Sequence, residues 1–138
     1  MNRQRVAEQL LGDEGLRLKP YRCTVGRLTI GVGRNLEDRG ITKAEAFVLL
    51  GNDIEAFWGE LAVAQPWVLA APEHVQEALL NMAFNLGVNG LLGFKETLAL
   101  LKTEQYSAAA SAMLASKWAR QVGKRAERLA RQVREGVF

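Results

Sequence analysis

The segment that follows Pro72 is apolar on nearly every side of a helix, and this constrains the fold more than any other feature of the sequence. Proline is favoured in the first turn of a helix. The apolar residues that follow it are Val75, Leu79, Leu80, Met82, Ala83 and Phe84. A helix that is apolar all round is buried among other elements. The sequence therefore predicts a helical bundle with its central helix here.

Other segments have the spacings of three and four that are typical of helices with one buried face. These segments are residues 3–12, 98–101, 108–115 and 126–133. Asn2 is placed to cap the first of them, and Gly15 is a natural stop. We expect these helices to pack around the central one.

A longer helix is expected from Thr42 to about Leu61. Thr42 and Glu45 form a capping box, in which each side chain accepts a hydrogen bond from the backbone N–H of the other residue. One apolar stripe follows for the whole length: Phe47, Leu50, Ile54, Phe57, Trp58 and Leu61. Such a helix is suited to connecting two lobes.

Between the first helix and the capping box, apolar residues alternate with small or polar ones. Leu28, Ile30 and Val32 share one face of a predicted strand, and Thr29 lies on the opposite face, which we expect to be the open one. Residues 25–27 are the expected hairpin tip, and Pro20 and Tyr21 the expected turn before it. A surface ion pair between Arg34 and Asp53 is also expected.

The predicted fold class is thus α+β, with a small β-hairpin lobe and a larger helical lobe flanking a cleft. The 138 residues suit a single domain. We expect the small lobe over about 13–41, the connecting helix over about 42–61, and the helical lobe over about 62–138 together with 1–12. Hydrophobic residues at 49% and charged residues at 24% exclude a disordered or fibrous chain.

The charge is uneven. The net charge is +3, but residues 117–138 alone carry seven Lys and Arg against two Glu. This basic tail favours an anionic partner, such as a nucleic acid, an anionic lipid or a cell-wall polymer, unless it is only a solvated helix face.

With one cysteine and one histidine, neither a disulfide nor a metal site is expected. No apolar stretch is typical of a signal peptide or a membrane span, which predicts synthesis as a soluble cytosolic protein.

Glu14 lies near the end of the first predicted helix, where the helix dipole disfavours an ionised carboxylate. A carboxyl group that keeps its proton near neutral pH can act as a general acid. Arg125 is a candidate cationic neighbour that would fix the side chain. The alternative is that Glu14 is an ordinary solvated residue at a helix end.

Four segments change the balance between these alternatives. They are DEGLRLKPY at 13–21, TIGVG at 29–33, NMAFNLG at 81–87, and Ser116-Lys117-Trp118 followed by Arg125. In this order, and over nearly the whole chain, they resemble the phage-type lysozymes (endolysins) of glycoside hydrolase family 24. The resemblance implies hydrolysis of the β-1,4 bond between N-acetylmuramic acid and N-acetylglucosamine in bacterial peptidoglycan, with inversion at the anomeric carbon.

The resemblance also implies roles for single residues. Glu14 would be the acid, and Cys23 and Thr29 would position the attacking water on the opposite side of the sugar ring. Gly31 would leave bare backbone at the cleft floor. Asn85 would contact an acetamido group, although a helix C-cap is an equally good explanation of that residue. No cofactor is expected, and the chain would act as a monomer, without nucleic acid or membrane insertion, after release from the host cytoplasm.

Cys23 departs from the best-known members of the family, which have aspartate at this point. A thiol with an ordinary pKa of about 8.5 supplies little negative charge at pH 7, but it can still orient a water molecule. A nucleophilic role is disfavoured because no histidine base is near in sequence. The remaining alternatives are that Cys23 is a small apolar filler and that Thr29 reflects strand propensity alone.

Three other functions compete with hydrolysis. A lytic transglycosylase would use Glu14 as both acid and base and would leave anhydro-muramic ends. A wall-binding module would bind sacculi without cleaving them, as the missing second carboxylate would allow. Nucleic-acid binding rests only on the basic tail and a pI near 9.3.

Overall fold

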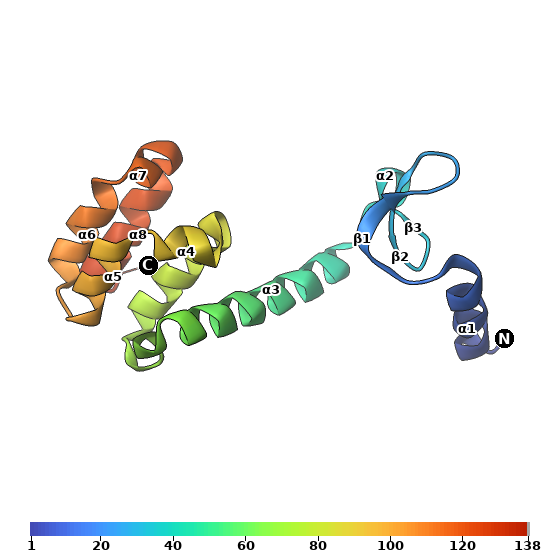
Figure 1. Ribbon diagram of the computed structural model, residues 1–138, viewed down its shortest axis with the longest axis horizontal. Helices are drawn as coiled ribbons and strands as arrows, with labels where there is room; N and C mark the ends of the chain where they lie inside the picture. Colours follow the sequence, from blue (N-terminus) through green and yellow to red (C-terminus); the bar gives the residue numbers. More distant parts are fainter. Residues whose placement is uncertain (138) are drawn as a thin grey trace. The chain divides into compact units, whose positions relative to one another are not determined.

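The computed structural model describes residues 1–137, and its contacts divide into two compact units (Figure 1). We call Met1–Leu49 the hairpin unit and Leu50–Phe138 the bundle unit. The elements of the hairpin unit are α1 (Arg3–Glu14), β1 (Arg17–Arg22), β2 (Leu28–Gly31), β3 (Arg34–Asn35), α2 (Leu36–Arg39) and the start of α3 (Lys43–Ala64). With a small sheet and many helices, the α+β fold class is confirmed. The expected division into lobes, including the place of residues 1–12, stays a prediction.

The first helix is capped at both ends by the residues that the sequence predicts, Asn2 and Gly15. The Asn2 side chain accepts a hydrogen bond from the Arg5 N–H at 3.0 Å, which satisfies one of the free donors at the helix start. At the other end, Gly15 has φ +74°, a backbone conformation that favours glycine. The helix is two residues longer than predicted, so Glu14 is its last residue.

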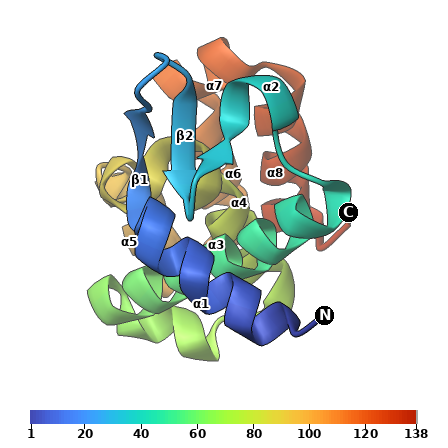
Figure 2. The same cartoon turned by 90° about the vertical axis from the view of Figure 1, so that its right-hand side faces the viewer.

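The sheet is antiparallel, with the order β1-β2-β3 (Figure 2). The expectation of a turn at Pro20 and Tyr21 was wrong, because both residues lie inside strand β1. A proline, which has no N–H to donate, is tolerated in an edge strand or at an irregularity. Strand β1 is at the edge of the sheet, and its register with β2 is irregular between Arg17 and Tyr21.

The start of α3 is held by the predicted capping box. The Thr42 N–H donates to Glu45 Oε1 at 2.9 Å, and the Glu45 N–H donates to Thr42 Oγ1 at 3.1 Å. Arg34 Nη2 lies 2.9 Å from Glu45 Oε2. The expected ion pair of Arg34 with Asp53, a residue of the bundle unit, stays a prediction. Glu45 thus caps its own helix and also binds the first residue of β3. Its carboxylate therefore joins the start of α3 to the sheet.

The bundle unit contains the rest of α3 and six further helical segments. They are the 3-10 helix η1 (Pro66–Ala70) and the α-helices α4 (Glu73–Leu92), α5 (Lys95–Lys102), α6 (Tyr106–Leu114), α7 (Lys117–Val122) and α8 (Lys124–Glu135). The predicted central helix is the first part of α4. Gly87, with φ +74°, interrupts α4, as the glycines of this region suggested.

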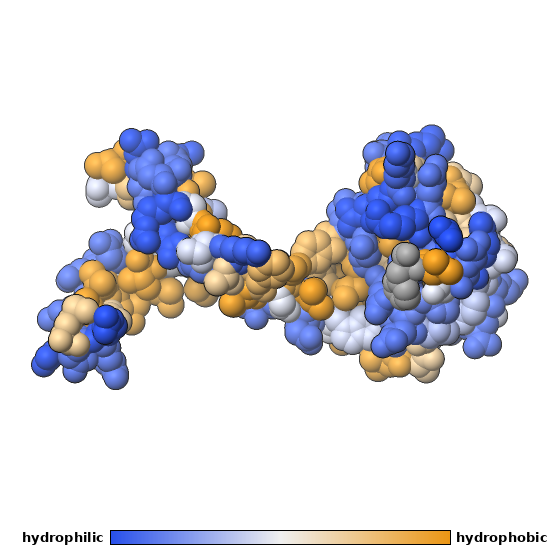
Figure 3. Space-filling view, turned by 180° about the vertical axis from the view of Figure 1, so that it is seen from behind, coloured by the Kyte–Doolittle hydropathy of each residue, from blue (hydrophilic) through white to orange (hydrophobic). Residues whose placement is uncertain are grey.

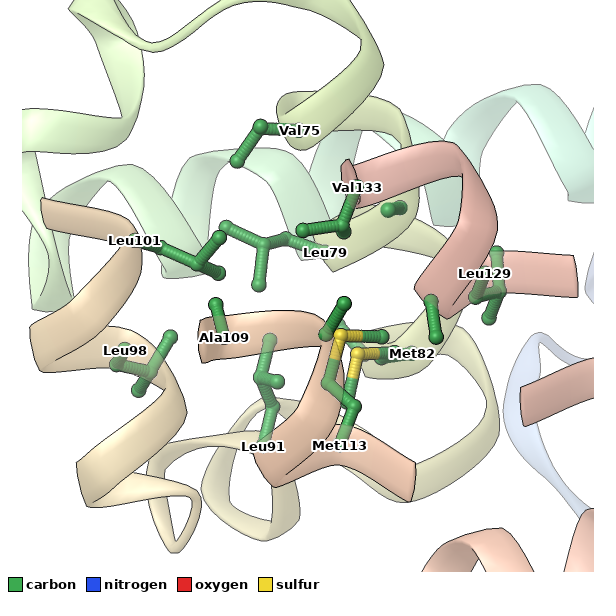
Figure 4. Packing of buried hydrophobic residues seen from close by; sticks show 14 of the residues in the cluster. Val75, Leu79, Met82, Leu91, Leu98, Leu101, Ala109, Met113, Leu129 and Val133 are labelled. Atoms are coloured by element: carbon green, nitrogen blue, oxygen red, sulfur yellow. The ribbon is translucent and has the colours of Figure 1, made fainter. Parts of the chain in front are cut away.

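The buried hydrophobic cluster lies in the bundle unit (Figure 4). Helix α4 contributes Val75, Leu79 and Met82, which meet side chains from α5, α6 and α8 such as Met113 and Val133. Truncation of a buried leucine such as Leu79 to alanine typically costs about 2–5 kcal/mol of stability. The surface of this unit is mostly hydrophilic on the side seen in Figure 3.

The link between Arg34 and Glu45 predicts how the hairpin unit responds to acid. The guanidinium of Arg34 and then the Thr42 N–H and side chain lower the pKa of Glu45 to about 2. A carboxyl whose pKa is depressed by folding stabilises the fold above its unfolded pKa of about 4.3, and this contribution is lost as the pH falls toward 2. We therefore expect Glu45→Gln, which keeps a capping side chain, to destabilise the hairpin unit at pH 7 but not at pH 2.

Urea unfolding followed by the amide NMR signals of β2 and β3 at the two pH values would measure this. Glu8→Gln, an exposed glutamate of α1, is the control and should have little effect at either pH. An equal loss of stability at pH 7 and pH 2 would contradict the assigned role of the Arg34 ion pair.

Candidate active site

The pairing of β1 with β2 brings the end of the first helix to the second sheet turn. Helix α1 ends at Glu14, Gly15 redirects the chain, and Arg17 pairs with Gly31 in the adjacent strand. The helix end is therefore separated by only two residues from the first paired position of the sheet. As a result, Glu14 lies beside the glycine-containing turn between β2 and β3.

The side chain of Glu14 packs against Gly33 in this turn. A methyl group built on Gly33 would lie 2.9 Å from both Cδ and Oε2 of Glu14, and 3.0 Å from its Cγ. The two distances of 2.9 Å are shorter than real Cβ atoms essentially ever show, so a side chain at position 33 would require the carboxyl group to move. Gly31, by contrast, has φ +70° and open space where a methyl group would be.

Cys23 lies at the opposite end of the same hairpin. Its N–H donates to the Arg27 carbonyl at 2.9 Å, and its own carbonyl accepts from the Gly26 N–H at 2.8 Å, so residues 23–27 form the predicted tight turn. The thiol is half-buried. The Val25 N–H, and then the Arg27 N–H, lower the pKa of Cys23 by hydrogen bonding to its sulfur. The thiol is therefore more acidic than the sequence alone suggested.

Thr29 is the residue whose placement differs most from expectation. We predicted that it faces the open side of the strand, but its side chain is buried, with only 3% exposed. Its hydroxyl donates to the Arg27 carbonyl at 2.8 Å. A hydroxyl has a single proton, so a hydrogen bond from Thr29 to the Cys23 sulfur, which lowers the pKa of the thiol further, is an alternative to the bond with Arg27. The side chains of Thr29 and Cys23, the two residues predicted to hold water, therefore lie within hydrogen-bonding reach of each other.

A carboxylate that sequence reasoning missed supports this turn. Glu37, in the first turn of α2, accepts a hydrogen bond from the Leu28 N–H at 3.0 Å and binds the guanidinium of Arg22. The pKa of Glu37 is lowered, chiefly by the Leu28 N–H and then by Arg22 and Arg27. These contacts join both strand ends that flank the Cys23 turn. No spacing in the sequence relates Glu37 to the hairpin, because the contact depends on the path of the chain through β3.

The other two predicted site residues belong to the bundle unit. Asn85 Oδ1 accepts a hydrogen bond from Trp118 Nε1 at 2.8 Å. Arg125 donates from Nε and Nη2 to Asn81 Oδ1 at 2.9 and 2.8 Å, and from Nη2 to the Asn81 carbonyl at 3.1 Å. Arg125 therefore joins α8 to α4. The expected contact of Arg125 with Glu14 stays a prediction.

The hairpin unit alone thus contains the predicted acid, the thiol and the hydroxyl. Glu14 adjoins the Gly31 end of β2, and Cys23 with Thr29 adjoins its Leu28 end. Among residues 1–137, no cluster of His, Cys, Asp and Glu is suited to bind a metal ion. Within the same range, no helix has the length and apolar character needed to cross a membrane.

Comparison with known proteins matches the amino-acid sequence to a family. The family model described as phage lysozyme matches residues 12–135, which include every predicted site residue. The chain belongs to the phage lysozyme family. It is therefore a glycoside hydrolase of the lysozyme type, which degrades peptidoglycan.

Three relatives of the chain are informative. It is 26% identical to "Probable T4-type lysozyme 1" of Dictyostelium discoideum, over 96% of this chain and 95% of that protein. It is 32% identical to the endolysin of Salmonella phage P22, over 77% of this chain and 76% of that protein. It is 30% identical to the pre-baseplate central spike protein Gp5 of Enterobacteria phage T4, over 90% of this chain but only 26% of that protein.

The hydrogen bonds around Cys23 predict how its thiol reacts. Since the thiolate is the reactive form, a lowered pKa moves the onset of alkylation to lower pH. We expect the rate of iodoacetamide alkylation of the folded chain to reach half its maximum at a lower pH than in the same chain unfolded in urea. Mass spectrometry of the single cysteine would follow the reaction. A half-maximum at equal or higher pH in the folded chain would contradict the assigned hydrogen bonds.

Proposed function

We propose that this lysozyme hydrolyses the β-1,4 bond between N-acetylmuramic acid and N-acetylglucosamine, with inversion at the anomeric carbon. The proposal is supported by the position of Glu14 beside one end of β2 and of Cys23 and Thr29 near the other end. The two groups thus lie near opposite ends of a four-residue strand, and their side chains set the distance between them. Inverting glycosidases need their two catalytic groups about 6.5–9.5 Å apart, so that a water molecule fits between sugar and base.

Glu14 is the proposed general acid. Glu14 is the last residue of α1 and is followed by Gly15, so the helix end fixes the backbone from which the carboxyl group extends. A protonated carboxyl group can donate to the leaving glycosidic oxygen as the bond breaks. The only groups needed for this step are the carboxyl group and a backbone that holds it in place.

Cys23 and Thr29 are the proposed water-positioning pair. The thiol accepts hydrogen bonds and its lowered pKa increases the fraction of thiolate, which can accept a proton from the attacking water. Thr29 is buried and its hydroxyl donates to the Arg27 carbonyl, so it would position the water indirectly, by holding the turn that carries the thiol. Attack from this end, opposite to the acid, inverts the configuration. Since nothing covalent forms on the enzyme, no histidine base is needed.

Substrate contacts are proposed for three further residues. Gly31 offers bare backbone at the β2 end next to Glu14, and no atom lies within 4 Å of the position of a methyl group there. Asn85 and Arg125 are the proposed contacts in the bundle unit, where Trp118 and Asn81 fix their side chains. The Asn85 amide nitrogen is the group left to meet an acetamido oxygen.

The proposed setting is lysis of a bacterial host. The relative in phage P22 is named an endolysin, and the basic residues of α8 suit an anionic wall polymer. We propose that the chain is made in the host cytoplasm, acts as a monomer on the wall after release, and neither binds nucleic acid nor inserts into a membrane. A lytic transglycosylase and a wall-binding module remain the alternatives that the experiments below would reveal.

The first experiment measures new reducing ends released from purified peptidoglycan. We expect wild-type protein to release them and Glu14→Gln to lose at least about a hundredfold in rate, because general acid catalysis contributes about 10²–10⁴-fold. Glu8→Gln, on the same helix, is the matched control and should keep wild-type activity. Early proton NMR spectra should show the new end first as the α anomer.

Other results would reassign the function. Anhydro-muramic ends in the product mass spectra would show a transglycosylase. Binding of wild type and Glu14→Gln to sacculi without any release of ends would favour the wall-binding module. Initial accumulation of the β anomer would exclude inversion while leaving the hydrolase intact.

A second experiment tests the thiol. We expect Cys23→Asp to stay active, since a carboxylate is ionised at neutral pH. We expect Cys23→Ala to lose at least tenfold in rate, because general acid–base catalysis contributes about 10²-fold or more. Thermal unfolding of each variant would establish that the fold persists. Full activity of a folded Cys23→Ala variant would remove Cys23 from the mechanism.

A further inference from the structure

The turn between β2 and β3 brings a glycine against the proposed acid. Gly33 has φ +66°, and its missing side chain would point at Cγ, Cδ and Oε2 of Glu14. The other turn glycines of the hairpin unit differ in this respect. Gly26, Gly31 and Gly40 also have positive φ, yet a methyl group on any of them would meet no atom within 4 Å.

We infer that Gly33 is a positioning residue for Glu14, and that its lack of a side chain sets where the carboxyl group lies. The inference rests on the proposed role of Glu14 as the acid. A methyl group at 33 would compete for the space that the carboxyl group occupies. Since the carboxyl is the far end of a flexible side chain, it would rotate away, and the turn itself would remain.

This geometry separates the effect on the fold from the effect on the reaction. Moving one exposed carboxyl group to another rotamer costs the hairpin unit little. The same movement takes the proton donor out of reach of the glycosidic oxygen, and a displacement of about 1 Å can slow a reaction by about 100-fold. Gly33→Ala therefore affects catalysis more than stability.

A second cost of Gly33→Ala must be separated from the first. Any residue other than glycine is strained at a φ of +66°, whatever space surrounds it. Gly40→Ala is the matched control, because Gly40 has φ +58° and open space at its methyl position. It also lies outside the proposed site. The two variants share the backbone strain, and only Gly33→Ala displaces Glu14.

The test begins with the wild-type protein. Two-dimensional NMR should show a nuclear Overhauser effect between the γ protons of Glu14 and the α protons of Gly33. The same effect should persist in Gly40→Ala. In Gly33→Ala, the chemical shift of the Glu14 carboxyl carbon should change, while that of Glu8 should not. These measurements are independent of activity.

Kinetics on soluble peptidoglycan fragments complete the test. We expect Gly33→Ala and Gly40→Ala to have similar unfolding midpoints, and Gly33→Ala alone to have kcat reduced by roughly tenfold or more with KM nearly unchanged. Absence of the Overhauser effect in the wild type would overturn the inference. Wild-type kcat in folded Gly33→Ala, or an equal loss of kcat in Gly40→Ala, would also overturn it.

The outcomes for the inference and for the proposed function are distinct. If Glu14→Gln keeps full activity, Glu14 is not the acid, and the proposed function fails whatever the NMR shows. If Glu14→Gln is inactive and Gly33→Ala is as active as wild type, the proposed function stands and the inference fails.

Discussion

The antiparallel pairing of β1 with β2 is the constraint on which the candidate site depends. The pairing of Arg17 with Gly31 brings the end of α1 to the turn that contains Gly33. The pairing of Arg22 with Leu28, at the other end of the strand pair, closes the turn that holds Cys23. One strand pair therefore sets the separation of the acid and the thiol. Neither residue needs a long-range contact of its own to be in place.

The thiol is supported by a set of backbone donors and not by a neighbouring base. The N–H groups of Val25 and Arg27 in the turn donate hydrogen bonds to its sulfur. Glu37 binds Arg22 and Leu28, the strand ends on either side of this turn. An aspartate at position 23 would carry its own charge at neutral pH, whereas a cysteine depends on its surroundings to acquire one. The family resemblance implied the position of Cys23, but the source of its acidity became visible only from the turn geometry.

The sequence predicted the features that depend on nearby residues. The cap at Asn2, the stop at Gly15, the capping box of α3 and the central helix α4 are each determined by a few adjacent side chains, and all are present. The strand at 17–22 was missed because Pro20 suggests a turn unless the edge position of the strand is known. The burial of Thr29 was missed for a related reason. Alternation along a strand shows which residues share a face, but not which face another segment will cover.

The three groups proposed for bond cleavage belong to Met1–Leu49, while Asn85 and Arg125, the proposed substrate contacts on helices, belong to Leu50–Phe138. Substitutions in the two parts are therefore subject to separate constraints. Under the proposed roles, changes on the surface of the bundle would alter which glycan strands or cross-links are accepted, without changing the hairpin proposed to break the bond. A lysozyme built this way can adapt to a new bacterial wall through its helices while its chemistry is inherited unchanged.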